Sequence, residues 1–372
     1  MRRPRPVVRA LAAAITIVLL LDARAVRTHV GAPTSAPSEL RTLALDAAKT
    51  VEGLRRLRFR HRVPIEVLPS AEFDRVLRRG PAGSSGGPGA VPLFVALGLI
   101  DPSVDLAGSG RAISSEVAGL YDAVGHRIVV RAGLDPVTLR HVLVHELTHA
   151  LDDQHFGLAR ATETFVSDES LTTLRAVFEG DARWVELHGS PPLPDRGAAT
   201  APPAVPPALL AYVAYPYEAG YAFVDRLRAR GGTRLLNDAF AHPPTSSAQI
   251  LQPELYPASG KSVEVRKPKP AGPVIDRGVF GELFVYLTLR SSVASAPALG
   301  AARQWAGGRY VIYEKETKVC IRATLETTTT GTSSVLDGLR QWAARHPAAT
   351  VVATGRLLEL ANCEAMPAAT SN

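Results

Sequence analysis

The sequence contains little sulfur and no dominant charge. Its 372 residues include two Cys and two Met, and its 42 Lys and Arg are nearly balanced by 35 Asp and Glu. Two cysteines are too few for a disulfide-dense scaffold, and their wide separation argues against a Cys-based zinc site. The formal net charge of +7 is modest for this length. Composition therefore excludes a disulfide framework and does not indicate a nucleic-acid-binding protein.

Motifs that define several other enzyme classes are also missing. The chain has no internal repeat, no heptad run, no Gly-rich phosphate loop and no Ser nucleophile elbow. These absences argue against solenoids, coiled coils, P-loop nucleotide hydrolases and α/β-hydrolases. The function must come from another constellation of residues.

The amino terminus has the features of a secretory signal peptide. Arg2, Arg3, Arg5 and Arg9 precede an apolar run at residues 10–21, and a small-x-small cleavage pattern follows at residues 23–25. The run is shorter than the roughly 20 residues that cross a bilayer. We therefore expect residues 1–25 to be removed and the protein to be secreted or held in the cell envelope. An uncleaved leader acting as a membrane tether is the alternative.

Removal of the leader changes the charge balance. Residues 1–25 hold five Arg and one Asp, so the formal charge falls from +7 to +3. The densest remaining cationic run spans residues 55–62. It fits a solvated helix end, with contact to an anionic cell envelope as the open alternative. No nucleic-acid motif accompanies the run, so no nucleic-acid partner is expected.

The two cysteines, Cys320 and Cys363, both lie in the C-terminal part of the chain. An even number of cysteines in an exported protein favours a disulfide. Cys320 falls in a predicted strand at residues 317–323, and Cys363 follows the last predicted strand, residues 356–360. A bridge would tie the end of the chain to its own sheet, and two reduced buried thiols are the alternative.

The most informative stretch is the sequence HELTH at residues 145–149. Asp135 and Pro136 form a helix start signal ten residues earlier, with Asp as N-cap and Pro at the first helical position. Apolar residues then recur at helical spacing through residue 151. On such a helix His145 and His149 project from one face and can bind one metal ion. Glu146 lies beside that ion, where it can accept a proton from a water molecule.

Two alternatives qualify this interpretation. The histidines can be buried helix residues with no ion, although the intervening Glu146 and the capped apolar helix favour a metal. His141 lies one further turn back on nearly the same face, so it could compete for the metal or hydrogen-bond to a ligand.

A tetrahedral catalytic site needs a third protein ligand. The next helical pattern, residues 168–187, carries Glu179-Gly180-Asp181-Ala182. A helix, a loop and a return helix would bring the Glu179 carboxylate to the histidines, whereas a solvated helix carboxylate is the alternative. Asp181 or Asp153 could accept the second N–H of a ligand imidazole and fix its tautomer.

At these residues the chain resembles the gluzincin zinc metallopeptidases, the thermolysin-like HExxH class. It is more closely similar to poorly characterised exported bacterial proteins of that class, over roughly residues 40 to 290. The stretches that carry the closer likeness lie at residues 145–151, 153–156, 179–182, 216–224, 243–246 and 249. The resemblance implies that His145, His149 and Glu179 bind Zn²⁺ and that Glu146 is the general base. Asp152 departs from the expected amide and Gln252 from the expected histidine.

Such a site would hydrolyse a peptide bond in a peptide or protein substrate. The tetrahedral oxyanion needs a donor besides the metal, and Tyr217 is our candidate because a phenol donates without carrying charge. Simple packing of its helix is the alternative for Tyr217. The sequence does not indicate which peptides are cleaved.

The pattern as a whole predicts an α+β protein. A polar tether at residues 26–38 precedes a mainly helical zincin-like catalytic domain at residues 39–290, with a short sheet beside the HExxH helix. A small α+β unit follows at residues 300–366. The expected function is an exported zinc metallopeptidase, and a non-catalytic exported envelope or binding protein on a gluzincin scaffold is the alternative. A scaffold has no need of Glu146, so its presence favours the enzyme.

Overall fold

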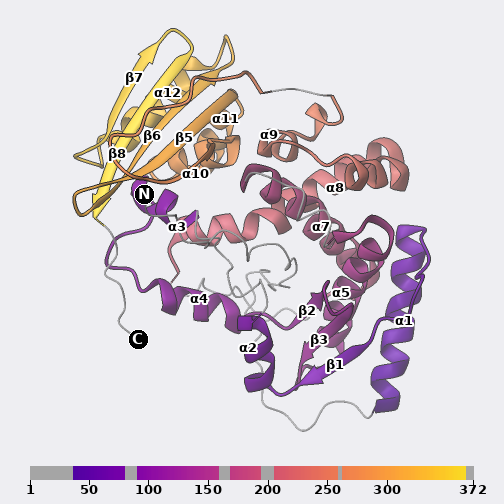
Figure 1. Cartoon of the computed structure of the whole chain (residues 1–372). Coiled ribbons are helices and arrows are strands. Elements are labelled where there is room, and N and C mark those ends of the chain that lie inside the picture. The colour runs from indigo at the N-terminus through magenta and orange to yellow at the C-terminus, as the bar shows by residue number, and fades with distance from the viewer. Residues whose placement is uncertain (1–36, 80–89, 159–167, 194–204, 259–261, 366–372) are drawn as a thin grey trace, which may run out of the picture.

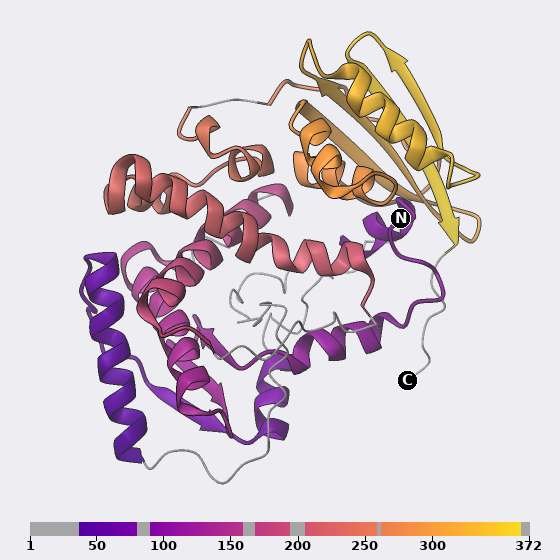
Figure 2. The same cartoon turned by 180° about the vertical axis from the view of Figure 1, so that it is seen from behind.

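Helices dominate the fold, and two small sheets lie apart from each other. The computed structural model describes residues 37–79, 90–158, 168–193, 205–258 and 262–365, and these contain eleven α-helices and eight strands. The three-stranded sheet and the five-stranded sheet lie at opposite ends of the molecule, with long helices between them (Figures 1 and 2). The structure therefore confirms the predicted α+β class with a helical majority.

The three-stranded sheet contains β1 (Ile65–Leu68), β2 (Gly119–Asp122) and β3 (Arg127–Arg131) in the order β1-β3-β2. β3 pairs in parallel with β1 and antiparallel with β2. β2 and β3 form a hairpin, in whose turn Asp122 accepts hydrogen bonds from the backbone N–H groups of Val124 and Gly125. The hairpin places β2 against the metal-motif helix.

That helix, α5 (Pro136–Phe156), begins where its sequence predicts. The Asp135 side chain accepts hydrogen bonds from the N–H groups of Val137 and Thr138, and Gly157 ends the helix at φ 70°. α1 (Pro37–Arg55), α7 (Asp168–Gly189), β2 and β3 all contact α5. Polar side chains in its middle are consequently buried from several sides.

α7 also packs along α8 (Pro207–Ala241). The two backbones approach closely at Gly180 and Gly220. A Cβ on Gly180 would overlap the Gly220 carbonyl group, and a Cβ on Gly220 would overlap the Ala176 carbonyl oxygen. α8 is broken at Gly232, which adopts φ 64° and ψ −157°.

Seven further helices complete the described fold. They are α2 (Ser70–Arg79), α3 (Ala90–Ala96), α4 (Leu106–Ser115), α9 (Ser247–Leu251), α10 (Glu282–Arg290), α11 (Ser295–Ala302) and α12 (Thr332–Ala343). None of the helices in the described residues is long and apolar enough to cross a membrane. The predicted signal peptide, and residues 26–36 of the predicted tether, lie outside the described residues.

The five-stranded sheet is antiparallel throughout, in the order β4-β5-β6-β8-β7. Its strands are β4 (Val274–Val279), β5 (Trp305–Lys315), β6 (Lys318–Thr327), β7 (Thr350–Thr354) and β8 (Leu357–Ala365). Cys320 and Cys363 stand opposite each other on β6 and β8 and form a disulfide. The predicted bridge is confirmed, although Cys363 lies within a strand and not after it.

The C-terminal sheet does not begin where the sequence suggested. β4 belongs to it, yet β4 falls inside residues 39–290, the range predicted for the catalytic domain. α3, from the N-terminal part, contacts β5, β6 and β8. The Trp342 indole and the Asn362 amide donate hydrogen bonds to the carbonyl groups of Leu97 and Ala96. One hydrophobic core therefore continues from the helices into the C-terminal sheet.

Candidate metal centre

The two histidines of α5 point the same way. The ring centroids of His145 and His149 are 4.8 Å apart, and both side chains are buried. Their separation of four residues places them on one helix face, as the sequence predicts.

Glu179 of α7 meets both imidazoles. Its Oε2 lies 3.4 Å from His145 Nε2 and 3.4 Å from His149 Nε2. One ligand atom from each of the three residues lies within 4.8 Å of the others, so the group could hold a metal ion. His149 Nδ1 has no hydrogen-bond partner within the described residues, and the hydroxyl of Tyr217 interacts with the Glu179 carboxylate. Buried donors and acceptors left unpaired are costly, and a bound cation would satisfy the acceptors.

Buried ion pairs from α1 hold α5 and α7 in place relative to each other. The buried Arg55 guanidinium of α1 lies 2.8 Å from Asp152 of α5 and 2.6 Å from Asp181 of α7. Asp152 follows His149 by three residues, and Asp181 follows Glu179 by two. Asp152 stands where the resemblance predicts an uncharged amide, and the buried Arg55 guanidinium compensates its negative charge. The two ion pairs of Arg55 join α5 to α7.

The carboxylate of Glu146 is fully buried beside the triad. Neither oxygen has a side-chain hydrogen-bond partner within the described residues, and the backbone of Tyr121 is the hydrogen-bonding group nearby. A Cβ on Gly119 of β2 would overlap Val142 Cγ1 and would touch Glu146 Cγ at 3.4 Å, so glycine lets β2 lie close to α5 at this point. Burial raises the pKa of Glu146 well above its usual value, His145 opposes this, and Glu179 adds to it. A carboxylate whose pKa is raised is a stronger base than an ordinary one.

The carboxylate that orients a ligand imidazole is Glu186, and not Asp181 or Asp153. His145 Nδ1 lies 3.2 Å from Glu186 Oε2, so its N–H donates to Glu186 and Nε2 is left facing Glu179. Asp181 instead pairs with Arg55 and Arg228. Asp153 accepts hydrogen bonds from the Tyr121 hydroxyl and the Leu158 N–H.

His141 is also bound to Glu186 and does not join the triad. Its Nδ1 lies 3.0 Å from Glu186 Oε1, and its Nε2 lies 2.8 Å from the Pro191 carbonyl oxygen. Arg183 donates to the same carboxylate at 2.9 Å. A signal for Glu186 was present in the sequence, since it follows Glu179 by two helical turns on the same face.

The charges of the triad are strongly coupled. Burial lowers the pKa of His145, but hydrogen bonds to Glu179 and Glu186 outweigh it and raise the pKa to about 9. Burial raises the pKa of Glu179, but the two histidines lower it to about 2. Burial lowers the pKa of His149, against the attraction of Glu179. Carboxylates and neutral imidazoles are the forms that bind metal ions, so a metal ion that binds here would displace the proton from His145.

Tyr217 of α8 lies against this group. Its ring centroid is 6.3 Å from that of His145, with 28° between the ring planes, and the side chain is buried. Burial raises the pKa of its hydroxyl, and nearby Glu179 raises it further. The hydroxyl therefore keeps its proton and can donate it in a hydrogen bond.

No protein-family model, curated protein or solved structure matches the chain. The gluzincin resemblance accordingly stays a prediction from the sequence motifs. The geometry of the candidate metal centre is independent of that resemblance, because it follows from side-chain positions alone.

Proposed function

We propose that this chain is an exported zinc-dependent metallopeptidase. The observation that supports it best is the position of Glu146, a fully buried carboxylate with no side-chain hydrogen-bond partner within the described residues, beside a buried His145-His149-Glu179 group. An isolated buried carboxylate destabilises a fold by several kcal/mol at the order-of-magnitude level. A binding protein would gain stability by losing Glu146, whereas a hydrolase needs it.

Zinc fits the three donors. Two imidazole nitrogens and one carboxylate oxygen are the ligand set of many catalytic zinc sites, and this set leaves a position for water. A zinc ion held there would polarise a peptide carbonyl and make water a better nucleophile at neutral pH. Glu186 would keep the Nε2 lone pair of His145 directed at the ion.

The side chains of the chain would then carry the proton transfers. Glu146 takes a proton from water as the water oxygen adds to the carbonyl carbon of the peptide bond. The C–N bond breaks, and Glu146 returns the proton to the leaving amine. Tyr217 donates a hydrogen bond to the oxygen that gains negative charge. Water is consumed, and the products are a carboxylic acid and an amine.

The substitution Glu146→Gln tests this function directly. The amide keeps the shape of the side chain but cannot accept the proton, so we expect peptide hydrolysis to fall by at least about a thousandfold while metal content is unchanged. Glu218→Gln, on the exposed side of α8, is the matched control. Wild-type protein that binds metal but hydrolyses no member of a peptide library would instead support the binding-protein alternative.

Tyr217→Phe separates the donor role of Tyr217 from packing. Loss of one oxyanion donor should lower kcat about a hundredfold with little change in KM. A packing role alone predicts near-normal kcat, because phenylalanine fills the same space. Steady-state kinetics on one peptide distinguishes the two roles.

A further inference from the structure

A pocket lies at the C-terminal end of α5, apart from the candidate metal centre. Its volume is about 910 Å³, and basic side chains from three separate segments line it. Arg60, His61 and Arg62 follow α1, His126 lies in the β2–β3 turn, and His155 lies in the last turn of α5. The metal-centre residues do not line this pocket.

The cationic run at residues 55–62 divides into two parts with different roles. Arg55 is buried in its ion pairs, and Arg58 pairs with Glu52 at 2.6 Å. Arg60 and Arg62 are exposed and make no ion pair within the described residues. Their charges are therefore available to a ligand.

The backbone that carries these two arginines is held in place. Gln154 of α5 accepts hydrogen bonds from the N–H groups of Arg60 and His61 at 2.7 and 3.2 Å. Its amide also donates to the His61 carbonyl oxygen at 3.0 Å. A wall fixed in this way loses less conformational entropy when it binds a ligand.

The carboxylate that lines the pocket is already occupied. Asp153 accepts hydrogen bonds from the Tyr121 hydroxyl and the Leu158 N–H, both at 2.7 Å, and lies 3.2 Å from His126 Nδ1. Among the described residues Asp153 forms no ion pair with Arg60 or Arg62, so the two guanidinium groups outnumber the one carboxylate of the pocket. Two exposed guanidinium groups beside histidines favour an anionic group that can accept hydrogen bonds.

β2 links this pocket to the candidate metal centre. Gly119 faces Glu146, and Tyr121, on the same face of the strand, reaches Asp153. Glu146 and Asp153 are seven residues apart on α5, which is about 10 Å at the rise of an α-helix. An extended peptide covers that distance in about three residues.

We infer that this pocket binds the carboxylate side chain of an acidic peptide, about three residues from the bond placed at the metal centre. The inference rests on the proposed peptidase function for the position of the bond. Binding of the acidic side chain itself does not require hydrolysis, so it can be tested separately.

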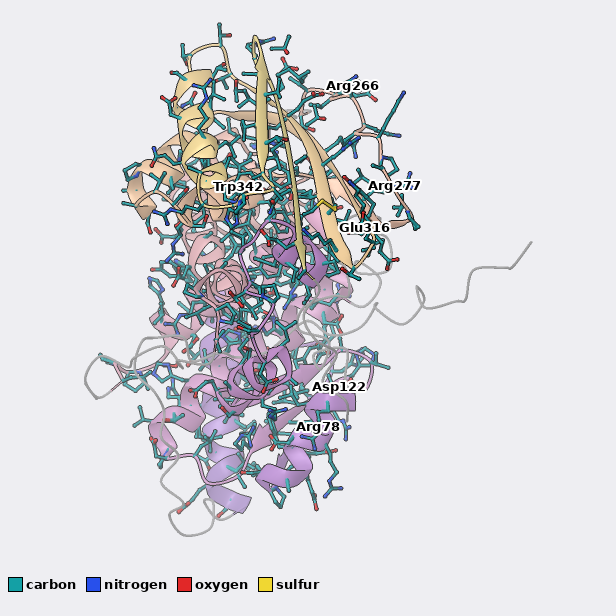
Figure 3. All side chains as sticks on the ribbon, turned by 90° about the vertical axis from the view of Figure 1, so that its left-hand side faces the viewer. Arg78, Asp122, Arg266, Arg277, Glu316 and Trp342 are labelled. Carbon is teal, nitrogen blue, oxygen red and sulfur yellow. A yellow bond between two sulfur atoms is a disulfide. The ribbon has the colours of Figure 1, made fainter. Side chains whose placement is uncertain are left out.

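The test measures binding of fluorescein-labelled hexaglutamate and hexaglutamine to protein carrying Glu146→Gln, which prevents cleavage. We expect hexaglutamate to bind at least about tenfold more tightly at low salt, with the preference falling as salt is added. The double substitution Arg60→Ala/Arg62→Ala should remove the preference. The control Arg277→Ala/Lys315→Ala removes two exposed charges from the five-stranded sheet, far from Asp122 of the β2–β3 hairpin (Figure 3), and should keep it.

Three results would overturn the inference. The two peptides could bind equally, the preference could survive Arg60→Ala/Arg62→Ala, or inorganic pyrophosphate could bind more tightly than hexaglutamate. The last result would indicate a phosphate site. Cleavage-site mapping adds a separate readout, since acidic residues should be enriched about three positions from the cleaved bond.

Failure of the pocket and failure of the proposed function give different results. Protein that prefers hexaglutamate while the wild type hydrolyses no peptide would reject the peptidase and retain the pocket. Protein that hydrolyses peptides with no acidic preference would reject the pocket and retain the peptidase.

Discussion

At the scale of single residues, Glu186 is the least expected part of the candidate metal centre. It accepts hydrogen bonds from His141, His145 and Arg183 at once. Burial raises its pKa, but the two histidines lower it below its usual range. The carboxylate therefore stays ionised and orients His145.

Glu186→Gln should consequently weaken metal binding. The amide of Gln has one acceptor oxygen where the carboxylate has two, and it carries no charge. We therefore expect metal affinity to fall roughly 10- to 100-fold. Competition with a chromogenic chelator measures this affinity, and Glu218→Gln should leave it unchanged. Equal affinity in wild type and Glu186→Gln would show that Glu186 does not act through His145.

The sequence predicts some of these residues and not others for a physical reason. His145, Glu146 and His149 share one helix, so their spacing alone determines their relative directions. Glu179 needed only the assumption of a return helix. The choice between Glu186, Asp181 and Asp153 depends on how α7 rotates against α5 and on where Arg55 of α1 lies. Those are tertiary contacts, which helical periodicity does not determine.

At the scale of elements, the crossing of α7 and α8 sets the position of Glu179 and Tyr217. Gly180 follows Glu179 directly, and Gly220 lies one turn after Tyr217. Neither glycine leaves room for a Cβ against the opposite backbone. Contact between the two backbones brings the side chains of Glu179 and Tyr217 together.

Gly220→Ala should separate these helices. The added Cβ meets the Ala176 carbonyl oxygen, so we expect a loss of about 1–3 kcal/mol in the free energy of unfolding together with weaker metal binding. Gly53→Ala in α1 is the control, because no atom lies within 4 Å of its Cβ position. Urea unfolding and metal titration measure both effects. Unfolding free energy equal to wild type in Gly220→Ala would contradict the close crossing.

At the scale of the whole molecule, buried carboxylates connect the helices to the C-terminal part. Glu169 of α7 accepts hydrogen bonds from the N–H and hydroxyl of Ser247 in α9. Glu282 of α10 accepts one from Gln252 at 2.7 Å. The resemblance predicts histidine at position 252, which could supply a positive charge, whereas the Gln252 amide is neutral. Burial raises the pKa of Glu282 to about 8 despite this hydrogen bond.

This raised pKa gives stability a definite dependence on pH. Folded protein holds the Glu282 proton up to about pH 8, whereas unfolded protein releases it near pH 4.5. The contribution of the protonated Glu282 to the free energy of unfolding is thus complete below pH 4.5. It is lost as the pH rises through 8, by up to about 1.4 kcal/mol per pH unit. Glu282→Gln should remove this slope from urea unfolding curves between pH 5 and 8. Equal slopes in both proteins would contradict the assignment.

The extent of the C-terminal sheet and its core was the feature that the sequence predicted least well. Strands β5 to β8 follow one another closely, so local patterns reveal them. β4 is separated from β5 by two helices, and α3 by some two hundred residues, and each contributes to the C-terminal sheet or its core through long-range contacts. Local periodicity has no information on such partners.

The central claim is that His145, His149 and Glu179 bind one metal ion. Elemental analysis of purified protein, beside the double variant His145→Ala/His149→Ala, tests it most directly. We expect about one zinc per chain in the wild type and none in the folded variant. Folded wild-type protein that takes up no zinc, or a variant that retains it, would contradict the account.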